Sequence, residues 1–264
     1  GKIDNANELS PMPENIIKSI ADDTNTVVNE IESNPVEENI ETTITETNNE
    51  GTLEFENVTF VYPDGEEPVI KNVSFSAKKG ETIAFIGSTG SGKSTLINLI
   101  PRFYDVTAGS IRIDGIDVRK FNLKALRKKI GFIRQKNLLF TGTIKSNIKF
   151  GKPHATHDEV EHSARIAQAY DFITNKEKGF DEPISEGGSN VSGGQKQRLS
   201  IARALVRKPE IYIFDDSFSA LDFKTDAILR KALKKETTDA IVLIVAQRIG
   251  SIMDADKIIV LDEG

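Results

Sequence analysis

A glycine-rich loop restricts the possible folds of this chain more than any other feature of its sequence. The loop fits the pattern G-x-x-x-x-G-K-[ST] over Gly87, Ser88, Thr89, Gly90, Ser91, Gly92, Lys93, Ser94 and Thr95. Its glycines allow successive backbone N–H groups to curl around an anion, because no Cβ atom blocks the turn. The Lys93 ammonium can reach the outer phosphates of a nucleotide, and the Ser94 hydroxyl suits Mg²⁺, which takes oxygen ligands.

Apolar segments on both sides of the loop support this interpretation. Residues 81–86 predict a buried strand that enters the loop, and residues 96–100 predict a helix that leaves it. The N-terminal dipole of such a helix favours bound phosphate. The alternative is a chance glycine-rich turn, and the presence of both the strand and the helix argues against it.

Composition limits the class of protein. The chain has 264 residues, enough for one large α/β domain or two small ones, and 38% of them are hydrophobic, which supports a sizeable core. It contains no cysteine, which excludes disulfides, thiolate metal sites and thiol catalysis and fits a reducing compartment. No signal-peptide pattern is visible, and the longest apolar run, residues 240–246, is much shorter than a membrane span. We therefore expect this chain by itself to be soluble.

Charge is distributed unevenly along the chain. Residues 1–50 hold 12 acidic and 2 basic side chains and carry a net charge of −10, whereas the whole chain carries −6, so the remaining residues carry +4. A mildly basic domain suits an anionic small ligand. Its Lys and Arg residues are scattered rather than clustered, so we expect no nucleic-acid partner.

The spacing of apolar residues divides the chain into two regions. Residues 1–14 lack periodicity, residues 16–31 carry apolar side chains at helical spacing, and residues 36–50 are rich in Glu, Thr and Asn. We therefore expect a tail, one amphipathic helix and an acidic linker in residues 1–50, followed by a folded domain in residues 51–264.

Within the folded domain, short apolar or alternating segments predict strands, and longer amphipathic segments predict helices. The expected strands are residues 53–55, 58–62, 69–75, 81–86, 110–113, 130–133, 211–214, 240–245 and 258–261. The expected helices are residues 96–100, 123–129, 159–172 and 201–206. The last three strands are wholly apolar, as expected of parallel strands covered on both faces, and their alternation with helices indicates the α/β class.

Two further motifs carry chemistry. The apolar residues 211–214 end in Asp215, and beside a phosphate loop such an aspartate belongs to the Mg²⁺ shell. A second candidate anion site precedes a helical segment and consists of Ser192, Gly193, Gly194 and Gln195. A simple helix cap is the alternative explanation for these four residues. Because one nucleotide needs only one phosphate loop, the second site requires an explanation.

In this order and combination, the motifs resemble those of ATP-binding cassette (ABC) ATPases, and in particular the nucleotide-binding domain of an ABC exporter. The resemblance covers residues 51–264. Besides the Walker A loop, Tyr62 matches the adenine-stacking aromatic residue and Gln135 matches the Q-loop glutamine. Residues 185–188 match an exporter-type X-loop, and residues 192–195 match the signature core. Asp215 matches the Walker B aspartate, and residues 219–222 match the D-loop. The resemblance implies an α/β P-loop fold with a mixed β-sheet core, an antiparallel β subdomain and an α-helical signature subdomain.

The resemblance also implies cofactors and partners. ATP and Mg²⁺ are the implied cofactors, with Ser94, Gln135 and Asp215 at the metal and Asp222 of the D-loop beside the nucleotide. These domains dimerise head to tail, so that each ATP lies between the Walker A loop of one subunit and the signature helix of the other. Residues 192–195 would therefore bind the ATP of a second nucleotide-binding domain, which explains the second anion site.

Exporter cassettes usually follow a transmembrane domain on the same polypeptide, which implies a location at the cytoplasmic face of the cell membrane. The helix expected over residues 16–31 then resembles the cytoplasmic end of that domain. Family members normally continue past residue 264, so we expect a chain truncated at both ends. Residues 140–148, which follow the Q-loop, would contact the transmembrane domain.

Two positions depart from the family pattern on the side that serves the chain's own ATP. Asp216 stands where the family usually has a Glu that orients or deprotonates the attacking water, and Gln247 stands where the switch residue is usually His. The shorter Asp side chain pulls the carboxylate back by about 1.5 Å. A misplacement of this size costs on the order of a hundredfold in rate. Gln can hydrogen-bond the γ-phosphate but cannot carry a charge.

We therefore assign catalytic roles to Gln135, Asp216 and Gln247, and predict the degenerate half of a heterodimeric exporter of multidrug type. It would bind Mg·ATP, hydrolyse it slowly and complete the site of a different subunit. Three alternatives remain: a working homodimer that tolerates both departures, a soluble ABC ATPase acting on ribosomes or DNA, and a regulatory subunit that does not hydrolyse ATP. The X-loop match and the presence of a single cassette argue against the soluble ATPase.

Three histidines, His154, His157 and His162, lie close together at the start of an expected helix. A metal site needs convergent ligands, so we prefer a solvated surface to a metal site here.

Overall fold

The computed structural model describes residues 50–247, 252 and 254–262. They belong to the second of two compact units, Asn48–Gly264, and the first unit is Gly1–Thr47. The tail, the amphipathic helix and the linker expected before residue 50 lie outside the described residues.

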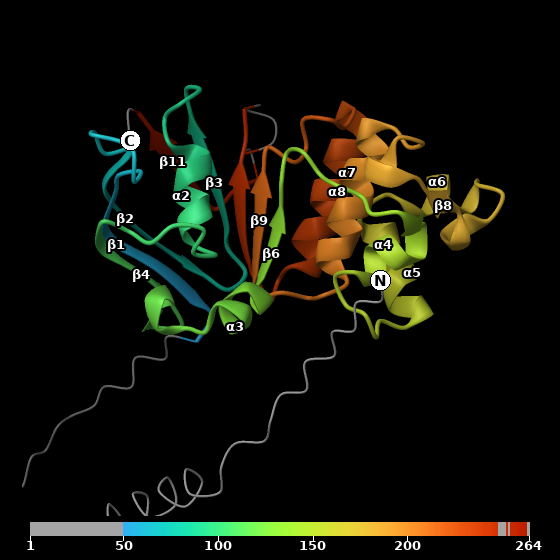
Figure 1. Cartoon of the computed structure of the whole chain (residues 1–264), viewed down its shortest axis with the longest axis horizontal. Coiled ribbons are helices and arrows are strands. Elements are labelled where there is room, and N and C mark those ends of the chain that lie inside the picture. Colours follow the sequence, from blue (N-terminus) through green and yellow to red (C-terminus); the bar gives the residue numbers. More distant parts are fainter. Residues whose placement is uncertain (1–49, 248–251, 253, 263–264) are drawn as a thin grey trace, which may run out of the picture. The chain divides into compact units, whose positions relative to one another are not determined.

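The first strands of the domain form an antiparallel sheet (Figure 1). β1 (Thr52–Phe60) pairs with β2 (Ile70–Lys78) and with β4 (Ala108–Ile113), and β4 also pairs with β5 (Ile116–Asp117). The sequence predicted two strands where β1 is one. A register shift between Phe55 and Val58 inserts an extra residue, so the buried side chains before and after this bulge lie on the same face.

The remaining long strands form a parallel sheet in the order β11-β3-β10-β9-β6. Its members are β3 (Thr82–Gly87), β6 (Ile130–Ile133), β9 (Ile211–Asp215), β10 (Ile241–Val245) and β11 (Lys257–Leu261). All four pairings between neighbours are parallel. The carboxyl ends of these strands therefore meet at one edge, and the segments that follow β3, β9 and β10 begin side by side there.

Helices connect these strands. They are α2 (Lys93–Leu99), α3 (Leu123–Lys128), α4 (Ile144–Lys149), α5 (His157–Ile166), α6 (Tyr170–Thr174), α7 (Gly193–Leu205) and α8 (Phe223–Glu236), with 3₁₀ turns η1 (Val118–Lys120), η2 (Gly179–Asp181) and η3 (Glu186–Gly188). A short antiparallel pair, β7 (Gly142–Thr143) and β8 (Pro183–Ile184), lies among the helices. The spacing of apolar residues in the sequence predicts neither α4 nor α8.

The prediction of a single helix over residues 159–172 is wrong, because α5 ends before α6 begins. Gln168 adopts a left-handed backbone with φ 56°. The Ala169 N–H donates to the Ala164 carbonyl and the Gln168 N–H to the Arg165 carbonyl, at 2.8 and 3.1 Å. This is the Schellman pattern of helix termination. The apolar spacing continues across the break because Ala164, Ala167, Ala169 and Ile173 all face the same core.

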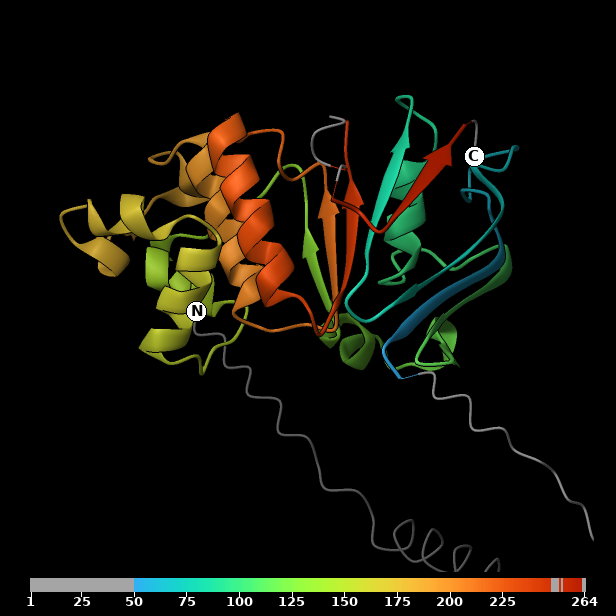
Figure 2. The same cartoon turned by 180° about the vertical axis from the view of Figure 1, so that it is seen from behind.

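Both faces of the parallel sheet are covered, which explains its wholly apolar strands. Side chains at alternating positions enter different cores: Ile83 and Phe85 of β3 pack with α2 and the antiparallel sheet, whereas Ala84 packs with the helices on the other face. β9 and β10 follow the same alternation. Figures 1 and 2 show α2 and α7 on opposite sides of this sheet.

β11 differs from the expectation that it is covered on both faces. Ile258 and Val260 are 49% and 66% exposed. β11 stands at one end of the strand order, and within the described residues only one of its faces packs against a core.

The predicted fold class is confirmed: the domain is α/β, with all its parallel pairs in the five-stranded sheet and its antiparallel pairs in the four-stranded sheet and the short β7–β8 pair. Among the described residues, no helix combines the length and apolar character that crossing a bilayer requires.

Burial on both faces makes a direct prediction about stability. Leu243 is fully buried in the central strand β10. We expect Leu243→Ala to lower the free energy of unfolding by about 2–5 kcal/mol, through lost transfer energy and a cavity. Val260→Ala, on the exposed face of β11, should change it by less than about 0.5 kcal/mol. Urea denaturation of both variants measures this difference, and equal losses would contradict the assignment of the two faces.

Candidate nucleotide-binding site

The predicted phosphate loop joins β3 to α2 at the carboxyl edge of the parallel sheet. Gly87, Gly90 and Gly92 adopt positive φ angles of 151°, 86° and 95°. A Cβ atom on Gly87 would lie 2.2 Å from the Leu261 carbonyl oxygen, and one on Gly92 would lie 2.9 Å from that of Val69. Glycine is therefore required at these two positions both by backbone conformation and by space.

Lys93 begins α2 and lies folded against the loop, with 9% of its surface exposed. Its ammonium donates to the carbonyl oxygens of Gly87 and Ser88, at 2.8 and 2.6 Å, and to the Ser91 hydroxyl at 3.2 Å. These three acceptors are uncharged, so they hold the Lys93 ammonium in the loop without neutralising its positive charge. The loop is thus a cationic cradle.

Ser94 and Asp215 meet although 121 residues separate them in the chain. The Ser94 hydroxyl donates to Asp215 Oδ1 at 3.0 Å. Burial raises the pKa of Asp215, and the Ser94 hydrogen bond and the charges of Arg134 and Lys93 act in the opposite direction without offsetting it. A hydroxyl and a carboxylate in such a place are the oxygen ligands that Mg²⁺ takes.

The predicted catalytic residues Gln135 and Asp216 also meet. The Gln135 side-chain amide donates to Asp216 Oδ2 at 2.7 Å. Asp216 has a left-handed backbone, φ 47°, which Asp tolerates better than most residues, and its N–H donates to the Val245 carbonyl of β10 at 3.0 Å. The Asp216 carboxylate is therefore engaged with the Q-loop side chain.

The structure places Gln247 and Tyr62 around the same loop. Gln247 is exposed and follows β10, which lies between β3 and β9 in the sheet. The Tyr62 hydroxyl hydrogen-bonds the Thr95 hydroxyl at 2.9 Å, beside the first turn of α2. The rings of Phe60 and Tyr104 lie nearly perpendicular to the Tyr62 ring, at 78° and 85°, with centroids 4.8 and 5.2 Å away.

The second candidate anion site is the start of α7. The Ser192 hydroxyl accepts from the Gln195 N–H at 3.2 Å, and Gln195 Oε1 accepts from the Ser192 N–H at 3.1 Å, so the two residues form a capping box. Gly193 is exposed, and no heavy atom lies within 4 Å of the position that a Cβ would take. The helix start is therefore both capped and open.

Asp222 of the predicted D-loop caps α8. It accepts from the Thr225 N–H and hydroxyl at 2.9 and 2.7 Å, and these bonds lower the pKa of the Asp222 carboxyl.

The structure therefore assembles most, but not all, of the predicted site. At the carboxyl edge of the sheet it gathers the phosphate loop, Gln135, Asp215, Asp216 and Gln247. The residues that begin α7 are not gathered there, because α7 belongs to the core on one face of the sheet and α2 to the core on the other.

Sequence reasoning missed the side chains that fix the segment around Gln135. The Ser217 hydroxyl donates to the Ile133 carbonyl at 2.7 Å, Asn137 donates to the side chain of Gln197 at 2.7 Å, and Arg203 donates to the Leu138 carbonyl at 3.0 Å. These residues follow no regular spacing in the sequence. The one signal that could have found them is their nearness in the chain to the motifs at Gln135, Gln195 and Asp215.

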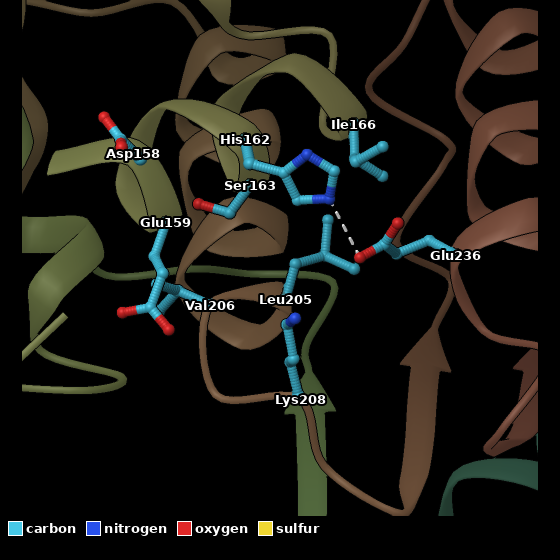
Figure 3. Close-up of a pocket in the computed structure, with 9 residues that line it drawn as sticks. All are labelled: Asp158, Glu159, His162, Ser163, Ile166, Leu205, Val206, Lys208 and Glu236. Atoms are coloured by element: carbon cyan, nitrogen blue, oxygen red, sulfur yellow. Dashed lines mark hydrogen bonds and ion pairs between the residues drawn. The ribbon is translucent and has the colours of Figure 1, made fainter. Parts of the chain in front are cut away.

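A cavity of about 330 Å³ lies away from this site, between α5 and the ends of α7 and α8 (Figure 3). Leu205, Val206 and Glu236 belong to segments that lead into the amino ends of β9 and β10, opposite the phosphate loop. His162, one of the three neighbouring histidines, hydrogen-bonds Glu236 at 3.0 Å. Within the described residues, no group of three or more His, Asp or Glu side chains is arranged to hold a metal ion.

Comparison with known proteins identifies the family. A family model described as ABC transporter matches residues 70–219, which is more than half of the chain and includes the phosphate loop, Gln135, the start of α7 and Asp215. The chain therefore belongs to the ABC transporter family.

Individual relatives agree with this assignment. The chain is 48% identical over 215 residues to a putative multidrug export ATP-binding/permease protein of Staphylococcus aureus strain NCTC 8325 / PS 47, and the match covers 81% of this chain and 37% of that protein. The protein of the same description from strain COL gives the same figures. A bacterial Atm1-family ABC exporter, solved with ATP bound, matches with a TM-score of 0.78 and 33% identity over 94% of this chain and 42% of that chain. The chain thus spans 37% of the length of these curated relatives.

The raised pKa of Asp215 predicts an unusual effect of its removal. Because burial disfavours the carboxylate, folding loses stability as pH rises from the unfolded pKa through the folded pKa. We expect Asp215→Asn to raise the melting temperature at pH 7 in the absence of divalent cations, and the gain to shrink as pH falls through the folded pKa. Differential scanning calorimetry at several pH values measures it.

The control for that variant is Asp117→Asn. The ion pair with Arg119, at 2.6 Å, lowers the pKa of Asp117, so this substitution should lower the melting temperature at pH 7. A loss of stability in Asp215→Asn comparable to that of the control would contradict the prediction.

Proposed function

We propose that this chain is the ATP-binding and ATP-hydrolysing cassette of an ABC exporter. The observation that carries the proposal is the 3.0 Å contact between Ser94 and Asp215 at the mouth of the loop held by Lys93. It joins a cationic phosphate cradle to a pair of oxygen ligands for Mg²⁺.

The residues present fit Mg·ATP. The left-handed glycines of the loop leave backbone N–H groups without crowding side chains, and Lys93 supplies the positive charge for the outer phosphates. Ser94 and Asp215 would hold Mg²⁺, with Gln135 next to them, and Tyr62 would stack on the adenine. Bound Mg²⁺ supplies charge that stabilises the phosphate oxygens during phosphoryl transfer to water.

Hydrolysis at this chain's own site is proposed to be slow. The Asp216 carboxylate is one methylene shorter than the usual Glu and accepts a hydrogen bond from Gln135, so it is poorly placed to orient the attacking water. Gln247, at the end of β10, can donate to a phosphate oxygen but adds no positive charge.

The signature residues are proposed to serve a different site. α7 and α2 pack on opposite faces of the parallel sheet, which supports the proposal that residues 192–195 act on the ATP of a second cassette rather than on the chain's own. The intact signature together with the two departures at the Walker side favours a heterodimer, in which the other subunit carries Glu and His.

Transport is proposed from the relatives and from one exposed surface. The relatives in Staphylococcus aureus are described as multidrug export ATP-binding/permease proteins. Phe140 and Phe150 are 45% and 64% exposed, and their rings are tilted by 38° with centroids 4.6 Å apart. Both rings lie against the guanidinium of Arg203, the pKa of which burial lowers to about 10. We assign this apolar surface to the contact with a transmembrane domain, residues 1–50 to the end of that domain, and the cassette to the cytoplasmic face of the membrane.

Two other functions receive less support. A homodimeric exporter cassette would need Asp216 to act as efficiently as Glu, which its hydrogen bond to Gln135 opposes. A soluble ABC ATPase acting on ribosomes or DNA would need a nucleic-acid surface, and the Lys and Arg residues of this chain are scattered.

Restoring the usual residues tests the slow site. We expect this chain to bind Mg·ATP with near-zero steady-state turnover, and Asp216→Glu with Gln247→His to raise turnover about a hundredfold, because the carboxylate then reaches the water. Lys93→Met in the restored chain should abolish the gain. Isothermal titration with Mg·ATP and phosphate release measure both quantities, and rapid hydrolysis by the unmodified chain would overturn the slow-site proposal.

Complementation tests the shared site. The restored chain with Ser192→Arg added has a competent Walker side and a blocked signature, so it should be inactive alone. Mixing it with the unmodified chain should recover turnover, since the unmodified chain supplies Ser192. Phosphate release is measured against the mixing ratio, with Ser192→Arg in both chains as the control. Inactive mixtures at every ratio would contradict a site shared between subunits.

A further inference from the structure

The segment that carries Gln135 is anchored at both ends. On one side, the Ser217 hydroxyl holds the Ile133 carbonyl at 2.7 Å, and Asp216 accepts from Gln135 at 2.7 Å. Ser217 and Asp216 directly follow β9, so these contacts belong to the Walker side of the domain. Any displacement of the Asp216 carboxylate therefore changes the hydrogen bond that Gln135 donates to it.

On the other side, the same segment is tied to the signature helix. The Asn137 side-chain amide donates to Gln197 Oε1 at 2.7 Å, and it also donates to the Arg134 carbonyl within its own segment. We call this contact the Asn137–Gln197 bridge. Gln197 lies five residues after Ser192, the cap of α7, which is about 7.5 Å along the helix axis. The bridge thus connects the segment that carries Gln135 to the second turn of α7, five residues after its cap.

Gln197 is a destabilising residue at its position, because it buries a hydrogen-bond donor without a partner in the part of the chain that the structure describes. It is 3% exposed, and its Nε2 has no hydrogen-bond partner within the described residues, as is also true of the buried Ser200 hydroxyl one helical turn further on. A buried donor without a partner destabilises a fold, and native structures contain few of them. An apolar side chain of similar length would fill the same space without this cost, so packing alone does not account for Gln197.

We propose that Gln197 is a positioning residue that, through the Asn137–Gln197 bridge, makes the signature start of α7 respond to the state of the chain's own nucleotide site. This rests on the proposed function, in which Mg·ATP binds beside Gln135 and Asp215. When the contacts of Gln135 change, Asn137 moves with it and carries the first two turns of α7. The chain's slow site thereby adjusts the residues that act on the ATP of the other subunit.

Hydrogen exchange of the 264-residue chain tests the proposal. Mg·ATP should change the exchange rate of the amides in residues 193–199, at a protein concentration low enough that the change is independent of concentration. In Gln197→Met this change should fall about fivefold, the factor expected for one hydrogen bond. The loss is partial because Arg203 still holds the Leu138 carbonyl at 3.0 Å.

Stability separates positioning from a structural role. Gln197→Met removes the unpaired Nε2, so its melting temperature should equal or exceed that of the unmodified chain while the response of α7 is reduced. Asn137→Ala should reduce the response to a similar extent, because it breaks the same bridge. Asn122→Ala is the matched control: it removes two hydrogen bonds at the cap of α3, lowers stability and should leave the response of α7 unchanged.

A ligand-free cycle keeps the test independent of ATP. Gln135→Ala breaks the contact with Asp216 and should alter exchange in residues 193–199, and the alteration should disappear when Gln197→Met is added. Failure to bind Mg·ATP would contradict the proposed function, while this cycle would still show whether the Asn137–Gln197 bridge links Gln135 to α7. An unchanged response of α7 in Gln197→Met, to Mg·ATP or to Gln135→Ala, would overturn the inference.

Discussion

The burial of both faces of the parallel sheet is the constraint on which the rest of this structure depends. Alternating side chains of β3, β9 and β10 enter two separate cores, one formed with α2 and the antiparallel sheet and the other with α7 and α8. This packing fixes three parallel strands side by side. The phosphate loop, Asp215 and Gln247 therefore lie together at the edge of the sheet where the carboxyl ends of these strands meet. The same sheet separates the phosphate loop from the signature helix.

The site is assembled at a cost to the fold. Burial that stabilises the core also raises the pKa of Asp215, and Gln197 buries a donor without a partner. Both costs lie where the proposed function needs them, at a cation site and at a link between two nucleotide sites. On these proposals, a site that hydrolyses ATP slowly is not idle, because its nucleotide still sets the position of the signature residues that serve the other subunit.

Local conformation was readable from the residues themselves. The G-x-x-x-x-G-K-[ST] loop, the strand that ends in Asp215 and the α/β class were all predicted, because glycine conformation and apolar spacing act over a few residues. The errors arose where a local pattern continues across a change in backbone. The alternation of apolar residues breaks near Asn57 and so predicts two strands where a bulge joins one, and apolar spacing continues past the turn at Gln168 into α6 and so predicts one helix instead of two.

The sequence by itself determined the class of ligand, through the phosphate loop, and it marked Asp216 and Gln247 as unusual. It could not determine what those residues touch. The contacts Ser94–Asp215, Gln135–Asp216 and Asn137–Gln197 join residues 121, 81 and 60 positions apart. Such contacts follow from how helices and strands pack over the whole domain, and side-chain burial in that packing also sets the pKa of Asp215. Only the tertiary structure therefore decided which side chains meet, because local propensity acts along the chain while packing acts across it.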